Sequence, residues 1–301
     1  MHAPTPVILD TDIGLDVDDV WALAFLLRCP ELDLRMVVSD SGNTHYGARL
    51  AAKLLTVAGR EDVAVGIGIP LDDVAQTHAG WLGDYALDSY RGAVHADGVG
   101  AMCDMIMRAD EPVTVISIGP VPNIAAALAR TPAITNNSRF VGMHGSLRRG
   151  YLGVEKPMRE YNVKKYPLAC QRVFATPWNI TITPLDSCGV VRLEDDRFSA
   201  VRHSTHPLSR AVIENHFGWF DVVSQWPMFK SMNAQAQSSI LYDTVAVYLA
   251  FAEDFLHMED LRVIVSDDGK TLIDPSGQSI RCATGWRDLT AFLDLLTARL
   301  T

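Results

Sequence analysis

The chain has 301 residues, a formal net charge of −10, and 48% hydrophobic against 21% charged residues. This composition is typical of a globular protein and excludes a disordered or fibrous chain. Because an acidic protein repels phosphate groups, the charge argues against nucleic-acid polymers and anionic membranes as partners. It favours a small neutral molecule or a cation.

The first half of the chain alternates short apolar runs with helical patterns. Strands are expected at residues 7–9, 34–39, 63–67, 113–118, 139–143 and 180–183. Helices are expected at residues 20–27, 44–58 and 123–129. This alternation predicts βαβ units and therefore an α/β fold, with a mainly parallel central sheet in a Rossmann-like open architecture.

The second half differs in pattern. Residues 204–251 are rich in aromatic side chains and are expected to be mostly helical. Short apolar segments at 261–265, 271–273 and 279–282, separated by DDG and PSG turns, predict a small antiparallel meander before a last helix at 289–300. Residues 144–162, rich in Gly, Arg and Lys, are expected to form a mobile loop. With neither an internal repeat nor a linker, we expect one domain over residues 1–301.

The five cysteines are scattered along the chain and form no CxxC pair. That spacing argues against a disulfide framework or a zinc knuckle and favours a reducing compartment. The N-terminus has no basic segment followed by a long apolar one, and no stretch approaches the about 18 apolar residues of a membrane helix. We therefore expect no signal peptide, no membrane span and a cytoplasmic location.

Five aspartates crowd the turn between the first strand and the first helix: Asp10, Asp12, Asp16, Asp18 and Asp19. In open α/β sheets, ligands bind at the carboxyl ends of strands. A helix dipole stabilises a nearby carboxylate by about 0.3–1 kcal/mol, too little to offset such crowding. Crowded carboxylates either take up protons or bind a cation, and hard oxygen ligands select Ca²⁺ or Mg²⁺. One or two of these aspartates could serve only as helix caps.

The segment VILDTDIGLDVDDVWAL (residues 7–23) closely resembles the N-terminal signature of nucleoside hydrolases, which is an apolar strand, DxDxG, a DD pair and an apolar helix. That family has one residue between the glycine and the DD pair, whereas Leu15, Asp16 and Val17 intervene here. Aligned from the helix side, Asp18 and Asp19 take the paired roles. Asp16 then falls in a two-residue insertion.

Later motifs follow in the family's order. They are Gly42-Asn43 for its GN element, His95 to Gly100 for its HGxxGLG loop, Ile118 to Asn123 for its TGGLTN turn, Glu160-Tyr161-Asn162 for its EFN element, and Tyr242-Asp243 for its HD pair. Each match is weak alone, and their order and spacing from Asp10 to Asp243 make the combination specific.

The resemblance implies Ca²⁺-dependent hydrolysis of a ribonucleoside to ribose and free base, through an oxocarbenium-like transition state. It implies that Ca²⁺ is bound by Asp10, Asp19, Asp243 and the carbonyl of Ile118. It further implies ribose contacts from Asp18, Asn43, Glu160 and Asn162. Asp12 is assigned as the general base on the metal-bound water. The family also implies a homodimer or homotetramer.

The acid that would protonate the leaving base is not identified by the sequence. Some family members have a His before the last aspartate, where this chain has Tyr242, and a phenol with a pKa near about 10 is a weaker acid. Tyr242 could donate a hydrogen bond or stack on the base, and His95 and His78 are the other acid candidates. Trp219, Phe220, Trp226 and Phe229 could line a base pocket or pack in the core.

Two other functions stay open. A haloacid-dehalogenase-like phosphatase also places a DxD after its first strand, but the DD pair Asp18-Asp19 has no role there. A degenerate relative that binds a nucleoside or sugar without turnover is suggested by Tyr242 and by the insertion at Asp16. The nucleobase is not identified by the sequence.

Overall fold

The structure is a computed structural model that describes residues 3–301. Its strands are β1 (Thr5–Thr11), β2 (Leu32–Ser39), β3 (Ala64–Ile67), β4 (Val94–His95), β5 (Val113–Ser117), β6 (Ser138–Met143), β7 (Ile180–Thr183), β8 (Leu256–Val265), β9 (Thr271–Ile273) and β10 (Gln278–Trp286). They form one ten-stranded sheet in the order β4-β3-β2-β1-β5-β6-β7-β10-β8-β9. All neighbouring strands from β4 across the sheet to β10 pair in parallel. The last two pairs, β10 with β8 and β8 with β9, are antiparallel.

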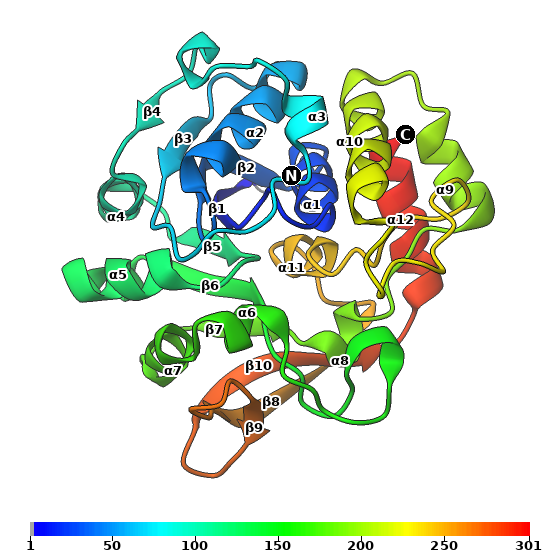
Figure 1. The fold of residues 1–301 in the computed structure, drawn as a ribbon. Coiled ribbons are helices and arrows are strands. Elements are labelled where there is room, and N and C mark those ends of the chain that lie inside the picture. Colours follow the sequence, from blue (N-terminus) through cyan, green and yellow to red (C-terminus); the bar gives the residue numbers. More distant parts are fainter. Residues whose placement is uncertain (1–2) are drawn as a thin grey trace.

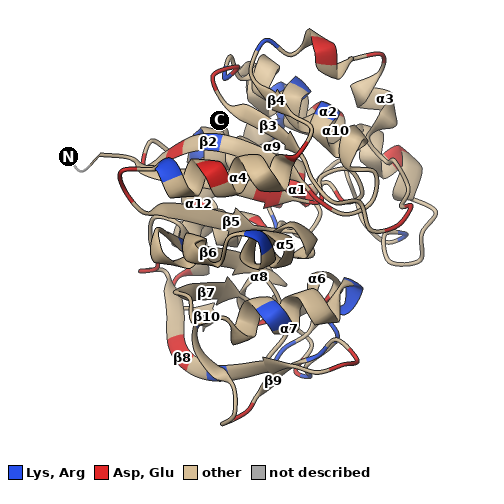
Figure 2. Ribbon diagram, turned by 90° about the vertical axis from the view of Figure 1, so that its left-hand side faces the viewer, with Lys and Arg blue, Asp and Glu red and all other residues tan. Residues whose placement is uncertain are grey.

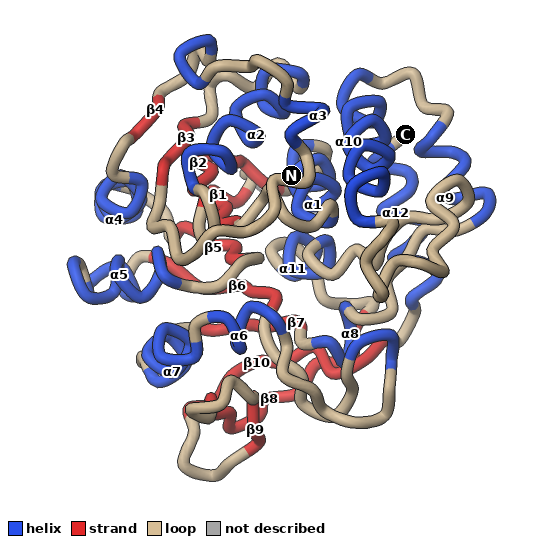
Figure 3. Tube along the Cα trace, viewed as in Figure 1, coloured by secondary structure: helices blue, strands red, loops and turns tan. Residues whose placement is uncertain are grey.

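Helices cover both faces of this sheet (Figures 1 and 3). They are α1 (Asp18–Leu27), α2 (Thr44–Val57), α3 (Ala79–Leu82), α4 (Gly98–Arg108), α5 (Pro122–Arg130), α6 (Tyr161–Lys165), α7 (Pro167–Ala175), α8 (Leu185–Cys188), α9 (Asp195–Arg202), α10 (Pro207–Val223), α11 (Thr244–Leu249) and α12 (Leu289–Leu300). Short 3₁₀ turns lie at Leu87–Ser89, Pro132–Asn136 and Tyr151–Gly153.

The sheet separates two apolar cores because successive strand side chains point to opposite faces. In β1, Val7 and Leu9 pack into the core under α1, α2, α10, α11 and α12, and Ile8 packs into the core under α4, α5 and α7. Strands buried on both faces explain the continuous apolar runs of the sequence. The predicted α/β class and mainly parallel sheet are confirmed.

The topology also determines where a ligand could bind. From β1 the chain builds the sheet outward through β2, β3 and β4, and it then returns to place β5 on the other side of β1. The strand order therefore reverses between β1 and β5. Ligands of open α/β sheets bind at the carboxyl ends of the strands at such a switch point.

Residues 204–251 depart from the expected mostly helical segment. Only α10 and α11 form there, and residues 224–243 are turns and irregular backbone between them. Pro227 accounts for this change, because proline has no N–H to donate and disfavours helical backbone at the residue before it, Trp226. The predicted antiparallel strands near the C-terminus are confirmed, but β8 lies between β9 and β10, so the three strands do not follow one another as a meander. β10 joins them to the main sheet by pairing in parallel with β7.

Basic and acidic residues are interspersed over α4, α5, α7 and the neighbouring loops on the face shown in Figure 2. All five cysteines are buried and unpaired. Among residues 3–301, the helices include none that combines the length and apolarity needed to span a bilayer.

Candidate active site

A cavity of about 260 Å³ opens where β1, β5 and β6 end. Its walls come from the turn after β1, the ends of β5 and β6, the start of α6, the end of α10 with the segment that follows it, and the turn before α11. Six carboxylates line it, which we call the acidic group: Asp12, Asp16, Asp18, Asp19, Glu160 and Asp243. The cavity therefore lies at the switch point between β1 and β5.

Three of these carboxylates, the carboxylate trio, are close enough to share one ion. One oxygen from each of Asp18, Asp19 and Asp243 lies within 4.8 Å of the others, and all three side chains are buried. Thr11 Oγ1 donates to Asp19 Oδ1 at 2.5 Å and fixes that side chain. Burial, followed by repulsion from neighbouring carboxylates, raises the pKa of each member of the trio well above its ordinary value. Oxygen donors crowded in this way fit a hard divalent cation, which would relieve the repulsion.

Asp12 faces the same cavity from the end of β1. Burial, opposed by a backbone hydrogen bond and reinforced by the charges of Glu160, Asp16 and Asp10, raises the pKa of Asp12 to about 7. Gly119 lies against it, and a Cβ at that position would be 2.9 Å from Asp12 Oδ1. The glycine therefore provides the space that the carboxylate occupies.

Asp10 is buried in β1 but does not line the cavity. Its Oδ1 accepts from Asn123 Nδ2 at 2.8 Å, and its Oδ2 accepts from Ser117 Oγ at 3.2 Å. Asn123 also donates to the Ser39 carbonyl and accepts from the Ile69 amide, so it joins β1, β2 and the loop after β3. Asp10 thus belongs to a polar network behind the carboxylate trio.

Glu160 and Asn162 occupy the start of α6. Glu160 caps this helix, and its carboxylate accepts from the backbone amides of Gly145, Asn162 and Val163. Burial raises the pKa of Glu160 to about 7, and these three N–H groups oppose the shift. Asn162 Nδ2 donates to the carbonyls of Ile118 and Met143, at 3.1 and 3.0 Å. Both amide hydrogens of Asn162 are therefore in use, and its amide oxygen remains available for a ligand.

Aromatic side chains make up most of the remaining cavity wall. This aromatic group comprises Tyr151, Tyr161, Trp219, Trp226, Phe229 and Tyr242, with Met228 beside it. Trp219 and Phe229 meet edge to face with ring centroids 4.8 Å apart, and Tyr151 and Tyr242 do so at 6.0 Å. Burial raises the pKa of Tyr242 well above its ordinary value, so its phenol stays protonated and can act only as a very weak acid.

Besides Asp10, four residues considered from the sequence lie away from the cavity lining: Asn43, His78, His95 and Phe220. Asn43 caps α2, where its Oδ1 accepts from the Tyr46 amide. His95 belongs to β4 and borders a separate depression with Asp97 and Arg130. His78 is buried, and its two ring nitrogens meet Asn215 Oδ1 and the Asp16 carbonyl.

Some residues of the cavity and of the network behind it were not predicted from the sequence. Tyr151 comes from the segment expected to be a loop. Tyr161 lies between the predicted ribose contacts Glu160 and Asn162, and this position in the motif could have indicated that it lines the site. Asp16 was set aside as part of an insertion, yet it lines the cavity. Asn123 stood in a recognised motif without a role, and it bonds Asp10.

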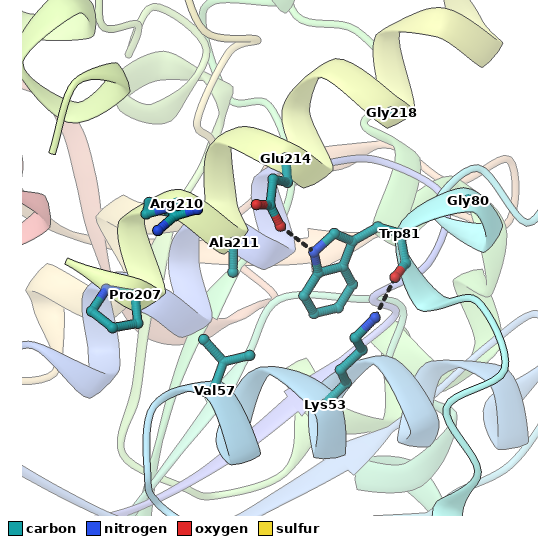
Figure 4. A pocket seen from close by; sticks show the side chains of 9 residues that line it. All are labelled: Lys53, Val57, Gly80, Trp81, Pro207, Arg210, Ala211, Glu214 and Gly218. Atoms are coloured by element: carbon teal, nitrogen blue, oxygen red, sulfur yellow. Dashed lines mark hydrogen bonds between the residues drawn. The ribbon is translucent and has the colours of Figure 1, made fainter. Parts of the chain in front are cut away.

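A second, larger depression of about 540 Å³ lies between α2, α3 and α10 (Figure 4). Trp81 lies there between Lys53 and Glu214, with its indole N–H donating to the Glu214 carboxylate at 3.2 Å and the Lys53 ammonium 4.3 Å from the ring centroid. One carboxylate already paired with an indole cannot support hydrolytic or metal chemistry of the kind that six crowded carboxylates can. The smaller cavity is therefore the candidate site.

Comparison with known proteins links this geometry to nucleoside hydrolases. Residues 7–293 match the family model described as inosine-uridine preferring nucleoside hydrolase. The non-specific ribonucleoside hydrolase RihC of Klebsiella pneumoniae is 34% identical over 191 residues, which are 60% of this chain and 61% of that protein. The Salmonella agona protein of the same name is 34% identical over 66% of this chain and 67% of its own length. The aligned part thus spans about two thirds or less of these relatives.

Solved structures agree on the fold. A plant nucleoside hydrolase superposes with a TM-score of 0.83 at 21% identity and covers 99% of each chain. A purine-preferring ribonucleoside hydrolase from Gardnerella vaginalis gives a TM-score of 0.80 at 22% identity over 98% of each chain. At these identities the superpositions establish a shared fold, and the match to the family model argues against the phosphatase alternative.

Proposed function

Since the chain belongs to the inosine-uridine preferring nucleoside hydrolase family, we propose that it hydrolyses the N-glycosidic bond of a ribonucleoside to ribose and free base. The observation that carries this proposal is the carboxylate trio beside Asp12 in one cavity. Breaking this bond builds positive charge at the anomeric carbon, which carboxylates stabilise, and it needs a water that has lost a proton. The acidic group could meet both needs.

We assign the cofactor as Ca²⁺, held by Asp18, Asp19 and Asp243 with the carbonyl of Ile118. The trio supplies hard oxygen donors close together, and the Ile118 carbonyl has a second lone pair beside its bond to Asn162. Asp10, expected as a ligand from the sequence, is left out of this set because it does not line the cavity and is not grouped with the trio; its carboxylate accepts from Asn123 and Ser117 instead. When bound, the ion lowers the pKa of a water and attracts the sugar hydroxyls.

Asp12 is the proposed general base. It lines the cavity with the trio, and its raised pKa of about 7 makes it a better proton acceptor than an ordinary carboxylate. As the nucleophilic water attacks the anomeric carbon, Asp12 takes its proton. The charge that appears at the sugar is balanced by the carboxylates around it.

Glu160 and Asn162 are the proposed ribose contacts. The Glu160 oxygens accept backbone N–H groups and keep free lone pairs for hydroxyl donors, and the Asn162 amide oxygen is another acceptor. Asp18, predicted from the sequence as a ribose contact, is close enough to Asp243 to serve the ion as well. The substrate class in this proposal is a ribonucleoside, cleaved by a homodimer or homotetramer.

The decisive experiment measures reducing sugar and free base released from a ribonucleoside panel, first with Ca²⁺ and then with EDTA. We expect turnover that EDTA abolishes and added Ca²⁺ restores. Binding of nucleosides without release of sugar would instead favour a degenerate binding protein.

A further inference from the structure

We propose that the preferred substrate is a ribonucleoside whose base carries a positive charge, such as an N-ribosylpyridinium or an N7-alkylated purine riboside. This inference rests on the hydrolase function proposed above. It is drawn from three features of one cavity: its excess of negative charge, the position of Asp16 beside the aromatic group, and the lack of an acid suited to protonating a neutral leaving base.

The first feature is charge. Six carboxylates line the cavity, and among residues 3–301 no Lys, Arg or His belongs to its lining. A divalent cation offsets two negative charges, which is less than the acidic group supplies when ionised. A cleft with low-dielectric walls and one sign of charge concentrates ligands of the opposite sign. A cationic base would therefore be favoured over a neutral base of the same shape.

The second feature is the position of Asp16, the residue of the two-residue insertion. Its Oδ1 accepts from the Val17 amide at 2.7 Å, and its Oδ2 accepts no hydrogen bond from the described residues. Its backbone carbonyl meets His78 Nε2 at 2.9 Å, and the carbonyl of Leu15 accepts from Trp219 Nε1 at 3.2 Å. The inserted loop is thus anchored against α10 and the residue before α3, with one oxygen of the Asp16 carboxylate left free at the cavity.

Asp16 also lies next to the aromatic group. It lines the same cavity as Tyr242 and Trp219. Tyr151 packs edge to face on Tyr242, and Trp219 does so on Phe229. Aromatic faces attract cations, and a nearby carboxylate adds to this attraction. Aromatic rings with one free carboxylate form the kind of site that binds a flat organic cation.

The third feature concerns the leaving group. A neutral base departs as an anion unless an acid protonates it, and the cavity lining offers a phenol but no imidazolium or ammonium. A positively charged base needs no acid. The water oxygen bonds to C1′ as the C1′–N bond breaks, the bond's electron pair neutralises the ring nitrogen, and Asp12 takes the proton lost by the water. The base then leaves as a neutral molecule.

The test compares matched substrates on matched variants. Nicotinamide riboside and 7-methylguanosine provide the cationic bases, and inosine and guanosine provide neutral ones, all assayed with Ca²⁺. Asp16→Asn removes the charge and keeps the shape, and Asp16→Glu keeps the charge. The measured quantity is kcat/KM for the cationic substrate divided by kcat/KM for the neutral one, because the intrinsic reactivity of each substrate cancels when this ratio is compared between variants.

We expect the wild type to prefer at least one cationic substrate, and Asp16→Asn to lower the ratio by about 10- to 100-fold. Asp16→Glu should recover most of it. Comparing nicotinamide riboside with 7-methylguanosine distinguishes a pyridinium pocket from a purinium pocket. A second readout needs no turnover: 1-methylnicotinamide should bind more tightly than nicotinamide by titration calorimetry, and Asp16→Asn should reduce that difference.

Each result bears on the inference separately from the hydrolase proposal. Efficient cleavage of inosine and guanosine, with a ratio that Asp16→Asn leaves within about twofold, would overturn the inference and leave the hydrolase function intact. Failure to cleave any of the four substrates in the presence of Ca²⁺ would overturn both.

Discussion

The acidic and aromatic groups line one cavity, yet parts of them are built in different ways. Asp12 comes from the turn after β1, and Asp18 and Asp19 are the first residues of α1. Trp226 and Phe229 come from the irregular segment after α10. The part of the cavity formed by the acidic group, the acidic wall, is therefore set mainly by the regular core of the fold. The part formed by the aromatic group, the aromatic wall, depends largely on a segment between helices.

The hydrogen bonds on the two walls differ accordingly. Thr11 holds Asp19, and Asn162 joins the ends of β5 and β6 through Ile118 and Met143. In the aromatic wall, the backbone around Trp226 and Phe229 makes only short turn contacts, such as the Phe229 amide to the Trp226 carbonyl. A rigid acidic wall suits chemistry that needs fixed geometry, and a less regular wall can differ in base preference without disturbing that chemistry.

The largest effect should follow from removing the proposed base on the acidic wall. We expect Asp12→Asn to lower kcat by about 10³-fold, within the range of 10²–10⁴ typical of general bases, since an amide cannot accept the water proton. Calorimetric titration should still find Ca²⁺ binding, because the carboxylate trio is unchanged. Asp10→Asn is the matched control, and its effect on kcat should be much smaller. Equal losses for the two variants would mean that the roles assigned to Asp10 and Asp12 are wrong.

Removing a hydroxyl from the sugar of the substrate tests the proposed ribose contacts. A site that bonds the ribose hydroxyls leaves buried polar groups unpaired when a hydroxyl is missing. We expect kcat/KM for a 2′-deoxyribonucleoside to be about 100-fold or more below that for its ribonucleoside. The measurement is base release from paired substrates that share one base. Equal rates on the two sugars would contradict the proposed ribose contacts.

Metal removal should make the stability of the acidic wall depend on pH. Burial raises the pKa of Asp12 from 3.8 to about 7, and that of Asp10 and Asp16 to about 6. A pKa raised by folding means that the folded form binds protons more tightly, so this stability is fully present below pH 3.8 and is lost as pH rises toward about 7. The Tm of the metal-free protein should therefore fall across that interval.

Calcium should counter this loss because it favours the ionised carboxylates. At a free Ca²⁺ concentration 100 times its Kd, binding stabilises the folded state by about 2.7 kcal/mol. For a chain of this length that corresponds to a rise in Tm of about 5 °C. Thermal unfolding with Ca²⁺ and with EDTA, at several pH values, checks both parts. If the rise in Tm caused by Ca²⁺ did not increase with pH, this result would argue against an ion bound by the trio.

The sequence predicted the acidic wall better than the aromatic wall, for physical reasons. Asp12, Asp18 and Asp19 are neighbours in the chain, and a strand followed by a helix always brings such a turn to the edge of the sheet. The family match confirms the resemblance from which their roles were inferred. Whether Asp10 faced the cavity depended on alternation along β1 and on Asn123, a partner far away in the sequence.

The aromatic wall depends on packing that no local pattern reveals. The Trp219 indole contacts Leu15 because α10 crosses the inserted loop, which requires the whole fold to be known. The segment 204–251 is predicted as mostly helical, and Pro227 is the signal that its part between α10 and α11 is not. His95 was considered an acid because it stands in a recognised motif, although the short strand β4 carries it to another depression.

The smallest effect is expected on the aromatic wall. Trp226→Ala removes one stacking surface, and stacking on an aromatic side chain contributes about 1–3 kcal/mol per base. We expect kcat/KM to fall about tenfold, mainly through a higher KM, while kcat changes little because the acidic wall is untouched. Trp81→Ala is the matched control, since it deletes an indole of similar exposure that lines the depression between α2, α3 and α10 (Figure 4). If both variants changed KM equally, the loss would reflect general loosening of the fold, and the aromatic group would not be the base site.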